Sequence, residues 1–278
     1  LAIIAAIFHL LNHATFKAAL FMLAGIIDHE SGTRDLRKLS GLWQLLPFTA
    51  TLTMITAASM AGVPLTNGFI SKEMFFTELL ANLSGGYVVL AAIVATLAGL
   101  FAVAYSVRLV HGVFFDGDVG RDVPNKNAHE PPIGMRIPAI ILATLCILVG
   151  IIPALLVENI VNAGTRASTQ IASFEGVHLA IWHGFNAPLV MSLIALVGGT
   201  LFYFALAKQG RLRKIDLDPS FGRFQGRILF DLFLKHLLLN SRKIKQATEN
   251  GSLQSYLLWI VLFSIFMVGL PLFNQGLT

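Results

Sequence analysis

Charged side chains are scarce in this sequence. Asp, Glu, Lys and Arg make up 13% of its 278 residues, whereas soluble domains average about 25%. Hydrophobic residues supply 55%, so we expect a membrane protein. The formal net charge of +5 does not predict nucleic acid binding, because in a membrane protein the distribution of basic residues over the loops decides their meaning.

Cysteine and catalytic motifs are almost missing as well. The single cysteine, Cys146, excludes an intrachain disulfide and a cysteine-based metal site, and its apolar surroundings favour a packing role. The sequence has no glycine-rich phosphate loop, no nucleophile elbow and no Cys/His metal spacing. We therefore expect no cofactor, no bound metal and no enzymatic reaction on a soluble substrate.

Long apolar runs dominate what is present. A membrane-spanning helix needs about 20 mostly apolar residues, and six runs are candidates: 1–27, 45–83, 87–110, 137–157, 188–207 and 255–273. The first run begins at Leu1 without Met or a basic start, so we expect an internal piece of a longer protein. The predicted fold is all-α, a polytopic transmembrane bundle of about six spans.

Basic residues are strongly biased toward one side of these spans. Segments 28–44, 108–136 and 208–254 hold three, four and ten Lys or Arg residues, which is 17 of the 20 in the chain. The opposite side, mainly segment 158–187, holds only Arg166. Since cytoplasmic loops carry the excess of Lys and Arg, we expect a multi-pass protein of the bacterial plasma membrane with the basic loops cytoplasmic.

Residues 220–249 show a different pattern. Polar residues, including Arg223, Arg227, Asp231 and Lys235, recur every four positions, with Phe and Leu between them. This spacing predicts an amphipathic helix that lies in the cytoplasmic interface of the membrane. A surface anchor is the simpler interpretation, and a docking site for a partner protein of the same complex is the alternative.

Two histidines and a lysine form a line within the first apolar run. His9, His13 and Lys17 are four residues apart, which puts them on one stripe of a helix. Lys17 is too deep to reach the headgroups easily, so the stripe should face other helices or water. Histidine titrates near neutrality, and a desolvated lysine releases its proton more readily. The pattern predicts a proton path, with a hydrogen-bonded packing stripe as the alternative.

The second apolar run is interrupted deep in the membrane, in the stretch MAGVPLTNGFISKEMFF. Irregular backbone at that depth is tolerated where it is buried in protein or lines a watery cavity. Ser71 is a candidate cap for the restarted helix, which would leave Lys72 and Glu73 in its first turn. Glu73 either pairs with Lys72 or faces the other way. Farther along, His111 ends the third run, where we expect it to be solvated.

Three stretches carry a resemblance to a known family. NHATFKAALFMLAGIIDHESGTRDLRKLSGL (12–42), VPLTNGFISKEMFF (63–76) and LAIWHGFNAPLVMSL (179–193) resemble the antiporter-like subunits shared by respiratory complex I and Mrp-type multisubunit cation/proton antiporters. The first and last stretches are more similar to the large A-type subunit of the Mrp antiporters. The resemblance is clear over residues 1–155 and looser over residues 156–278.

The resemblance implies both a role and partners. Residues 1–155 would end a proton-translocating unit of four spans, and residues 156–278 would add two spans and the amphipathic helix. Lys17 matches the family's central lysine, His9 and His13 the histidines before it, and Lys72 the lysine of a broken helix. The implied activity is exchange of protons for Na⁺ by a complex with other membrane subunits in the lipid bilayer, without nucleic acid.

Two other functions stay open. The chain would be a proton-pumping subunit of a complex I-like NADH:quinone oxidoreductase if electron transfer drove the same path. The amphipathic segment 220–249 is shorter than the long lateral helix of the complex I subunit, which favours the Mrp type. A non-conducting scaffold subunit is the third possibility.

Overall fold

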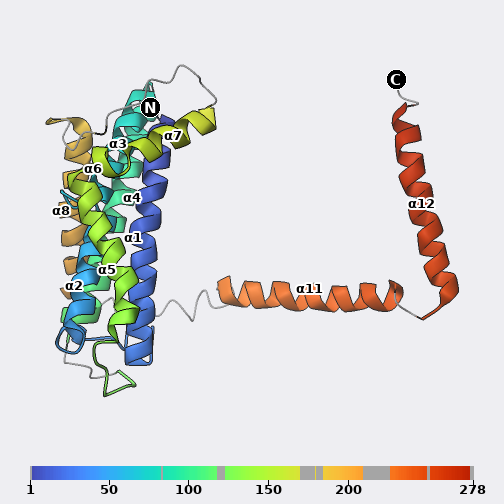
Figure 1. The fold of residues 1–278 in the computed structure, drawn as a ribbon, viewed down its shortest axis with the longest axis horizontal. Helices are drawn as coiled ribbons and strands as arrows, with labels where there is room; N and C mark the ends of the chain where they lie inside the picture. Colours follow the sequence, from blue (N-terminus) through green and yellow to red (C-terminus); the bar gives the residue numbers. More distant parts are fainter. Residues whose placement is uncertain are drawn as a thin grey trace. The chain divides into compact units, whose positions relative to one another are not determined.

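All the regular secondary structure in the described part of the chain is helical, as the sequence predicts (Figure 1). The computed structural model describes residues 2–82, 84–117, 123–169, 179, 184–208, 226–248 and 251–275. They fall into two compact units, Leu1–Lys214 and Ile215–Thr278. The predicted division at residue 155 separates a proton-translocating unit from two further spans. The boundary between these compact units does not test that division, which stays a prediction.

Four helices of the first unit are long and apolar enough to cross a membrane: α1 (Ala2–Ser31), α4 (Gly86–Val110), α5 (Ile133–Ile151) and α8 (Ala187–Lys208). A π-helical turn, η2 (His111–Phe115), continues α4. These helices confirm the first, third, fourth and fifth apolar runs as helices. Hydropathy predicts these helices well because their side chains are apolar both on the buried face and on the exposed face.

The second run forms two half-helices, α2 (Pro47–Ala61) and α3 (Asn67–Asn82), on either side of a break. Three short helices complete the first unit: η1 (Leu42–Gln44), α6 (Pro153–Leu156) and α7 (Glu158–Thr169). The sequence predicts a loop between spans at residues 158–187 and does not predict α7. That helix exists because it is amphipathic, and its Val161 packs with Ile4 and Phe8 of α1.

The core of the first unit lies where α1 meets the broken helix and α5. α1 contacts α2, α3 and α5, while α4 contacts both α2 and α8 (Figure 1). Phe8 of α1, Phe69 and Ile70 of α3 and Val149 of α5 are all buried in one cluster. Residues at the start of α3 are therefore held against the middle of α1, which fixes the break beside the His9 stripe.

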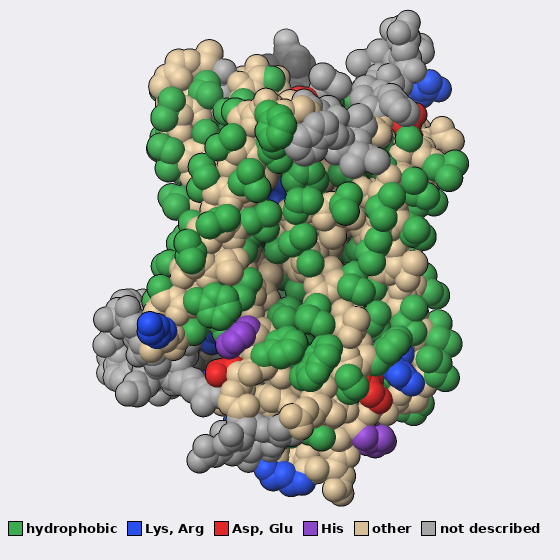
Figure 2. All heavy atoms as spheres, turned by 90° about the vertical axis from the view of Figure 1, so that its left-hand side faces the viewer, with side chains coloured by type: hydrophobic (Ala, Val, Ile, Leu, Met, Phe, Trp, Pro, Cys, Tyr) green, Lys and Arg blue, Asp and Glu red, His purple; other side chains and the backbone are tan. Residues whose placement is uncertain are grey.

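Charged side chains are concentrated toward the ends of this unit. Figure 2 shows a face whose middle is covered mainly by hydrophobic side chains, with most of its acidic, basic and His side chains near the lower end. Phe101, Ile141, Val197 and Phe202 are among the apolar side chains that remain exposed on the long helices. Such a surface suits a hydrocarbon environment, and the lower end carries the predicted basic loops.

A loop on that basic side fastens two helix ends. Asn125 donates through Nδ2 to the Glu30 carbonyl at 2.7 Å, at the end of α1. Glu130 accepts from the backbone N–H of Phe48 at 2.7 Å and of Thr49 at 2.9 Å, at the start of α2. A carboxylate that accepts from the first N–H groups of a helix is a stabilising cap. The loop thus holds α1 and α2 at their basic-side ends.

The second unit consists of α11 (Gly226–Thr248) and α12 (Leu253–Gln275). α11 confirms the predicted helix over its described residues, while residues 220–225 and 249 of that prediction lie outside them. α12 contains a shorter apolar stretch, Leu253–Gly269, so the sixth run is a helix too. Placement of α11 in the membrane interface stays a prediction.

Candidate functional site

The break in the second run lies between Ala61 and Asn67. α2 ends at Gly62, whose left-handed backbone (φ 82°, ψ 42°) is a conformation that glycine adopts at little cost. The N–H groups of Gly62 and Val63 both donate to the Ala58 carbonyl at 3.0 Å. This closed turn ends α2 inside the bundle, so the negative end of its dipole lies beside the site.

Two glycines allow the broken segment to pack tightly. A Cβ on Gly68 would lie 1.8 Å from the Ser59 carbonyl oxygen of α2, and one on Gly150 would lie 2.4 Å from the Leu65 carbonyl oxygen. No side chain fits at either position. The Ser59 hydroxyl also donates to Asn67 Oδ1 at the start of α3. The break is thus a packed and hydrogen-bonded structure held by α2, α3 and α5.

Lys72 turns back across the break to the end of α2. Its Nζ donates to the Ala61 carbonyl at 2.5 Å. The predicted capping role of Ser71 is wrong, because α3 already begins at Asn67. Lys72 therefore lies in the second turn of α3 and not at its N-terminus. A hydrogen-bonding carbonyl, and not the positive end of α3, is its immediate partner.

Lys17 approaches the same helix end from α1. Its Nζ lies 3.2 Å from the Met60 sulfur of α2 and 5.6 Å from the centroid of the Tyr105 ring of α4. A polarisable thioether and an aromatic face both attract a cation. The structure thus places this lysine among three helices, as its depth in the first run predicts.

The two lysines converge on consecutive residues of α2. Lys17 contacts Met60, and Lys72 bonds to the carbonyl of Ala61. A helix C-terminus carries a partial negative charge of roughly half an electron, which attracts ammonium groups. Both lysines thus contact the last turn of α2, Lys72 through a backbone carbonyl and Lys17 through the Met60 side chain, and spacing along the sequence did not indicate this.

His9 and His13 lie on one face of α1, as their spacing predicts. Their ring centroids are 5.7 Å apart. His9 Nδ1 shares a hydrogen bond of 2.6 Å with the Ser71 hydroxyl of α3. Ser71 therefore joins the histidine stripe to the half-helix that carries Lys72. The sequence placed Ser71 beside Lys72 but gave no sign that it would bond to His9.

Glu73 faces away from Lys72. Its side chain is buried with 1% exposure, and Asn186, just before α8, places Nδ2 3.5 Å from Oε1. Of the two alternatives left open by the sequence, the structure supports the second. Asn186 lies far along the chain from Glu73, so its approach depends on the packing of α8 against α3.

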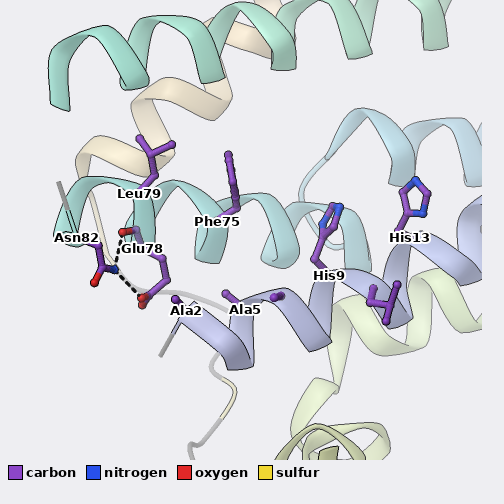
Figure 3. A pocket seen from close by; sticks show the side chains of 10 residues that line it. Ala2, Ala5, His9, His13, Phe75, Glu78, Leu79 and Asn82 are labelled. Atoms are coloured by element: carbon purple, nitrogen blue, oxygen red, sulfur yellow. Dashed lines mark hydrogen bonds between the residues drawn. The ribbon is translucent and has the colours of Figure 1, made fainter. Parts of the chain in front are cut away.

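Two grooves meet at His9. One, of about 720 Å³, is lined by α1 and α3 and contains His9, His13 and Glu78. Figure 3 shows both histidines projecting from α1 alongside Phe75, with Glu78 and Asn82 hydrogen-bonded at the far end. The other groove, of about 550 Å³, is lined by α3 and α4 and contains His9 and Lys72. His9 therefore borders both the space beside His13 and the space beside Lys72.

Comparison with known proteins decides the family. Residues 1–102 match the family described as NADH:quinone oxidoreductase/Mrp antiporter, transmembrane. This chain belongs to that family. The match covers α1, the broken α2 and α3, and most of α4, so every residue of the predicted site lies in the family's own region.

Members of the Mrp branch are similar along nearly the whole chain. A probable K(+)/H(+) antiporter A/B subunit of Rhizobium meliloti is 44% identical over 274 residues, 98% of this chain and 27% of that protein. The Na(+)/H(+) antiporter A subunit of Alkalihalophilus pseudofirmus is 38% identical, with 98% of this chain and 34% of that protein covered. The chain thus spans about a quarter to a third of the length of these relatives.

A solved structure agrees with these relatives. The Mrp complex from Dietzia sp. DQ12-45-1b contains a chain that superimposes with a TM-score of 0.68 at 28% identity. The alignment covers 98% of this chain and 28% of that one. The resemblance inferred from the sequence is thereby confirmed, together with the multi-pass helical fold.

Proposed function

We propose that this chain is part of the large subunit of a multisubunit monovalent cation/proton antiporter. The supporting observation is the convergence of Lys17 and Lys72 on the end of α2, beside the His9 stripe. Protons move along a path formed by His9, His13, Lys17, Lys72 and Glu73. Such groups, linked by water, take up and release protons without any cofactor.

The transported cation is Na⁺ or K⁺. Relatives of this chain carry names for both ions, K(+)/H(+) for the one at 44% identity and Na(+)/H(+) for the one at 38%. Lysines repel cations, so the path described here carries the proton, and the cation crosses elsewhere in the complex. The complex lies in the bacterial plasma membrane with other membrane subunits, and its basic loops 28–44, 108–136 and 208–254 face the cytoplasm.

Cation-triggered decay of an imposed pH gradient tests this proposal. Inverted vesicles hold the assembled complex with the full-length protein, no electron donor is present, and Na⁺ or K⁺ is added. Wild type should collapse the gradient, and Lys17→Ala should abolish the response. Lys38→Ala, a change to an exposed lysine on the basic side, is the matched control and should respond like wild type.

Other results of this assay would point to the alternatives. Equal responses from Lys17→Ala and wild type would contradict the proton path and favour a scaffold role. Proton movement that appears only after an electron donor is added would favour a complex I-like proton pump, since the matched family contains both kinds of protein. Immunoblots of assembled complex keep loss of transport separate from loss of protein.

A further inference from the structure

A third cavity is lined by residues of α2, α4 and α8 and by none of α1. It has a volume of about 310 Å³ and is lined by α2, α4, η2 and α8. Ala61 and Val63 contribute at the break, and His111 contributes where η2 begins. Seven residues of α2 separate Met54 from Ala61 along this cavity, a rise of about 10 Å. The space therefore leads from the break toward the basic side.

Lys72 is hydrogen-bonded to a residue that lines this cavity. The lysine lines the α3 and α4 groove, while its ammonium donates to the carbonyl of Ala61, a residue that lines the third cavity. Lys72 thus lines one space and is hydrogen-bonded to a residue in the wall of the other.

His111 is the titratable side chain among the described residues that line the third cavity. The sequence leads one to expect a solvated histidine, but the ring is only partly exposed, because α8 packs against it. His111 Nδ1 and the Tyr203 hydroxyl are 3.0 Å apart, and Tyr203 is 4% exposed. Phe204 places its ring edge-on at 5.2 Å between centroids. The imidazole is therefore held in one orientation.

The backbone at His111 is unusual in an independent way. η2 is a π-helical turn from His111 to Phe115, a wider winding that is rare in proteins and is found frequently at functional sites. His111 is the first residue of this turn, and its ring contacts Tyr203 and Phe204 of α8.

We propose that His111 is a proton-carrying residue at the basic-side end of a branch that starts at Lys72. This inference rests on the proposed antiport function. A proton leaves Lys72 Nζ, crosses the third cavity through hydrogen-bonded water, binds the free nitrogen of His111 and is released toward the basic side. Only N–H and O–H bonds break and form, so no oxidant or reductant is needed. The cavity is wide enough for several waters, since each occupies roughly 30 Å³, and Ser106, Thr200 and His111 supply the polar side chains of its mostly apolar wall.

The polar and charged groups near the His111 imidazole come from α8 and from the end of α4. Tyr203 faces it from α8, and Arg108 and Asp116 lie close enough to act on the Tyr203 hydroxyl. α2 contributes apolar side chains such as Met54 and Ala57.

His111→Gln tests the proposal in the same vesicle assay. Glutamine preserves a hydrogen bond to Tyr203 but cannot carry a proton, so exchange should fall at least tenfold and its pH profile should change. Tyr203→Phe removes only the positioning bond and should lower the rate a few-fold while the pH dependence remains. His236→Gln, a change to an exposed histidine of α11, is the control and should behave like wild type.

Thr200→Leu is a second variant that leaves His111 in place. Thr200 lines the cavity, and a larger apolar side chain should fill it and slow exchange. Wild-type rates and pH profiles in both His111→Gln and Thr200→Leu would overturn the proposal. If Lys72→Ala abolishes exchange while these two variants are normal, only the His111 branch is refuted. If Lys72→Ala and Lys17→Ala are also normal, the proposed function fails as well.

Discussion

Gly62→Ala should displace Lys72 without altering any titratable group. The added Cβ would lie 2.7 Å from Lys72 Cδ and 3.3 Å from Nζ, whereas carbon atoms pack best at about 3.5–4.0 Å. The lysine side chain must therefore move off the Ala61 carbonyl. Since hydrogen bonds to charged groups contribute about 1.5–3 kcal/mol, their loss corresponds to roughly a tenfold to hundredfold slower exchange if the bond supports proton transfer.

Backbone strain must be separated from this effect. Alanine in the left-handed region costs roughly 1–2 kcal/mol, and Gly62 has φ 82°. Gly251→Ala is the matched control, because Gly251 also has a positive φ of 74° but has no atom within 4 Å of the position where a Cβ would lie. The assay is cation-triggered decay of a pH gradient in inverted vesicles, normalised to assembled complex. Equal rates in the two alanine variants would refute the role given to the bond between Lys72 and Ala61.

Three further changes test the architecture around the site. Ser71→Ala removes the partner of His9 and should slow exchange about threefold to tenfold, from a bond of about 1 kcal/mol, while Ser71→Thr should keep the wild-type rate in the vesicle assay. Gly150→Ala forces a methyl into the backbone of the break and should lower the thermal stability of the purified complex by several degrees, measured by a melting assay. Glu130→Gln weakens the cap at Thr49, worth about 1 kcal/mol, and should lower the same melting temperature. The pH profile of exchange in vesicles should stay unchanged, and a changed profile would contradict a purely structural role for Glu130.

The helices themselves could be predicted closely from the sequence. Apolar runs of about 20 residues are a strong signal, since backbone groups in a membrane must be satisfied within the helix. The interruption near Pro64 was predicted because glycine and proline residues in that stretch disfavour a continuous helix. α7 was missed, because a short amphipathic helix at a bundle end has no long apolar run and is stabilised by the packing of Val161 onto α1.

The residues of the site were predictable, but their partners were not. A four-residue spacing fixes His9, His13 and Lys17 on one stripe whatever the rest of the fold does. The bond from Lys72 to Ala61 depends on where α3 restarts, and the sequence placed that point at Ser71 instead of Asn67. Contacts from Tyr105 and from Asn186 depend on how α4 and α8 pack, which no local pattern determines.

Lys17→Arg is the most direct test of the proton path. Arginine keeps the positive charge beside Met60 and Tyr105 but does not release its proton at physiological pH. Exchange of Na⁺ or K⁺ for protons would be measured in inverted vesicles with matched amounts of assembled complex and no electron donor. The proposed path predicts that wild type exchanges and that Lys17→Arg does not. Exchange by Lys17→Arg at the wild-type rate would contradict it, because a fixed charge would then serve as well as a proton carrier.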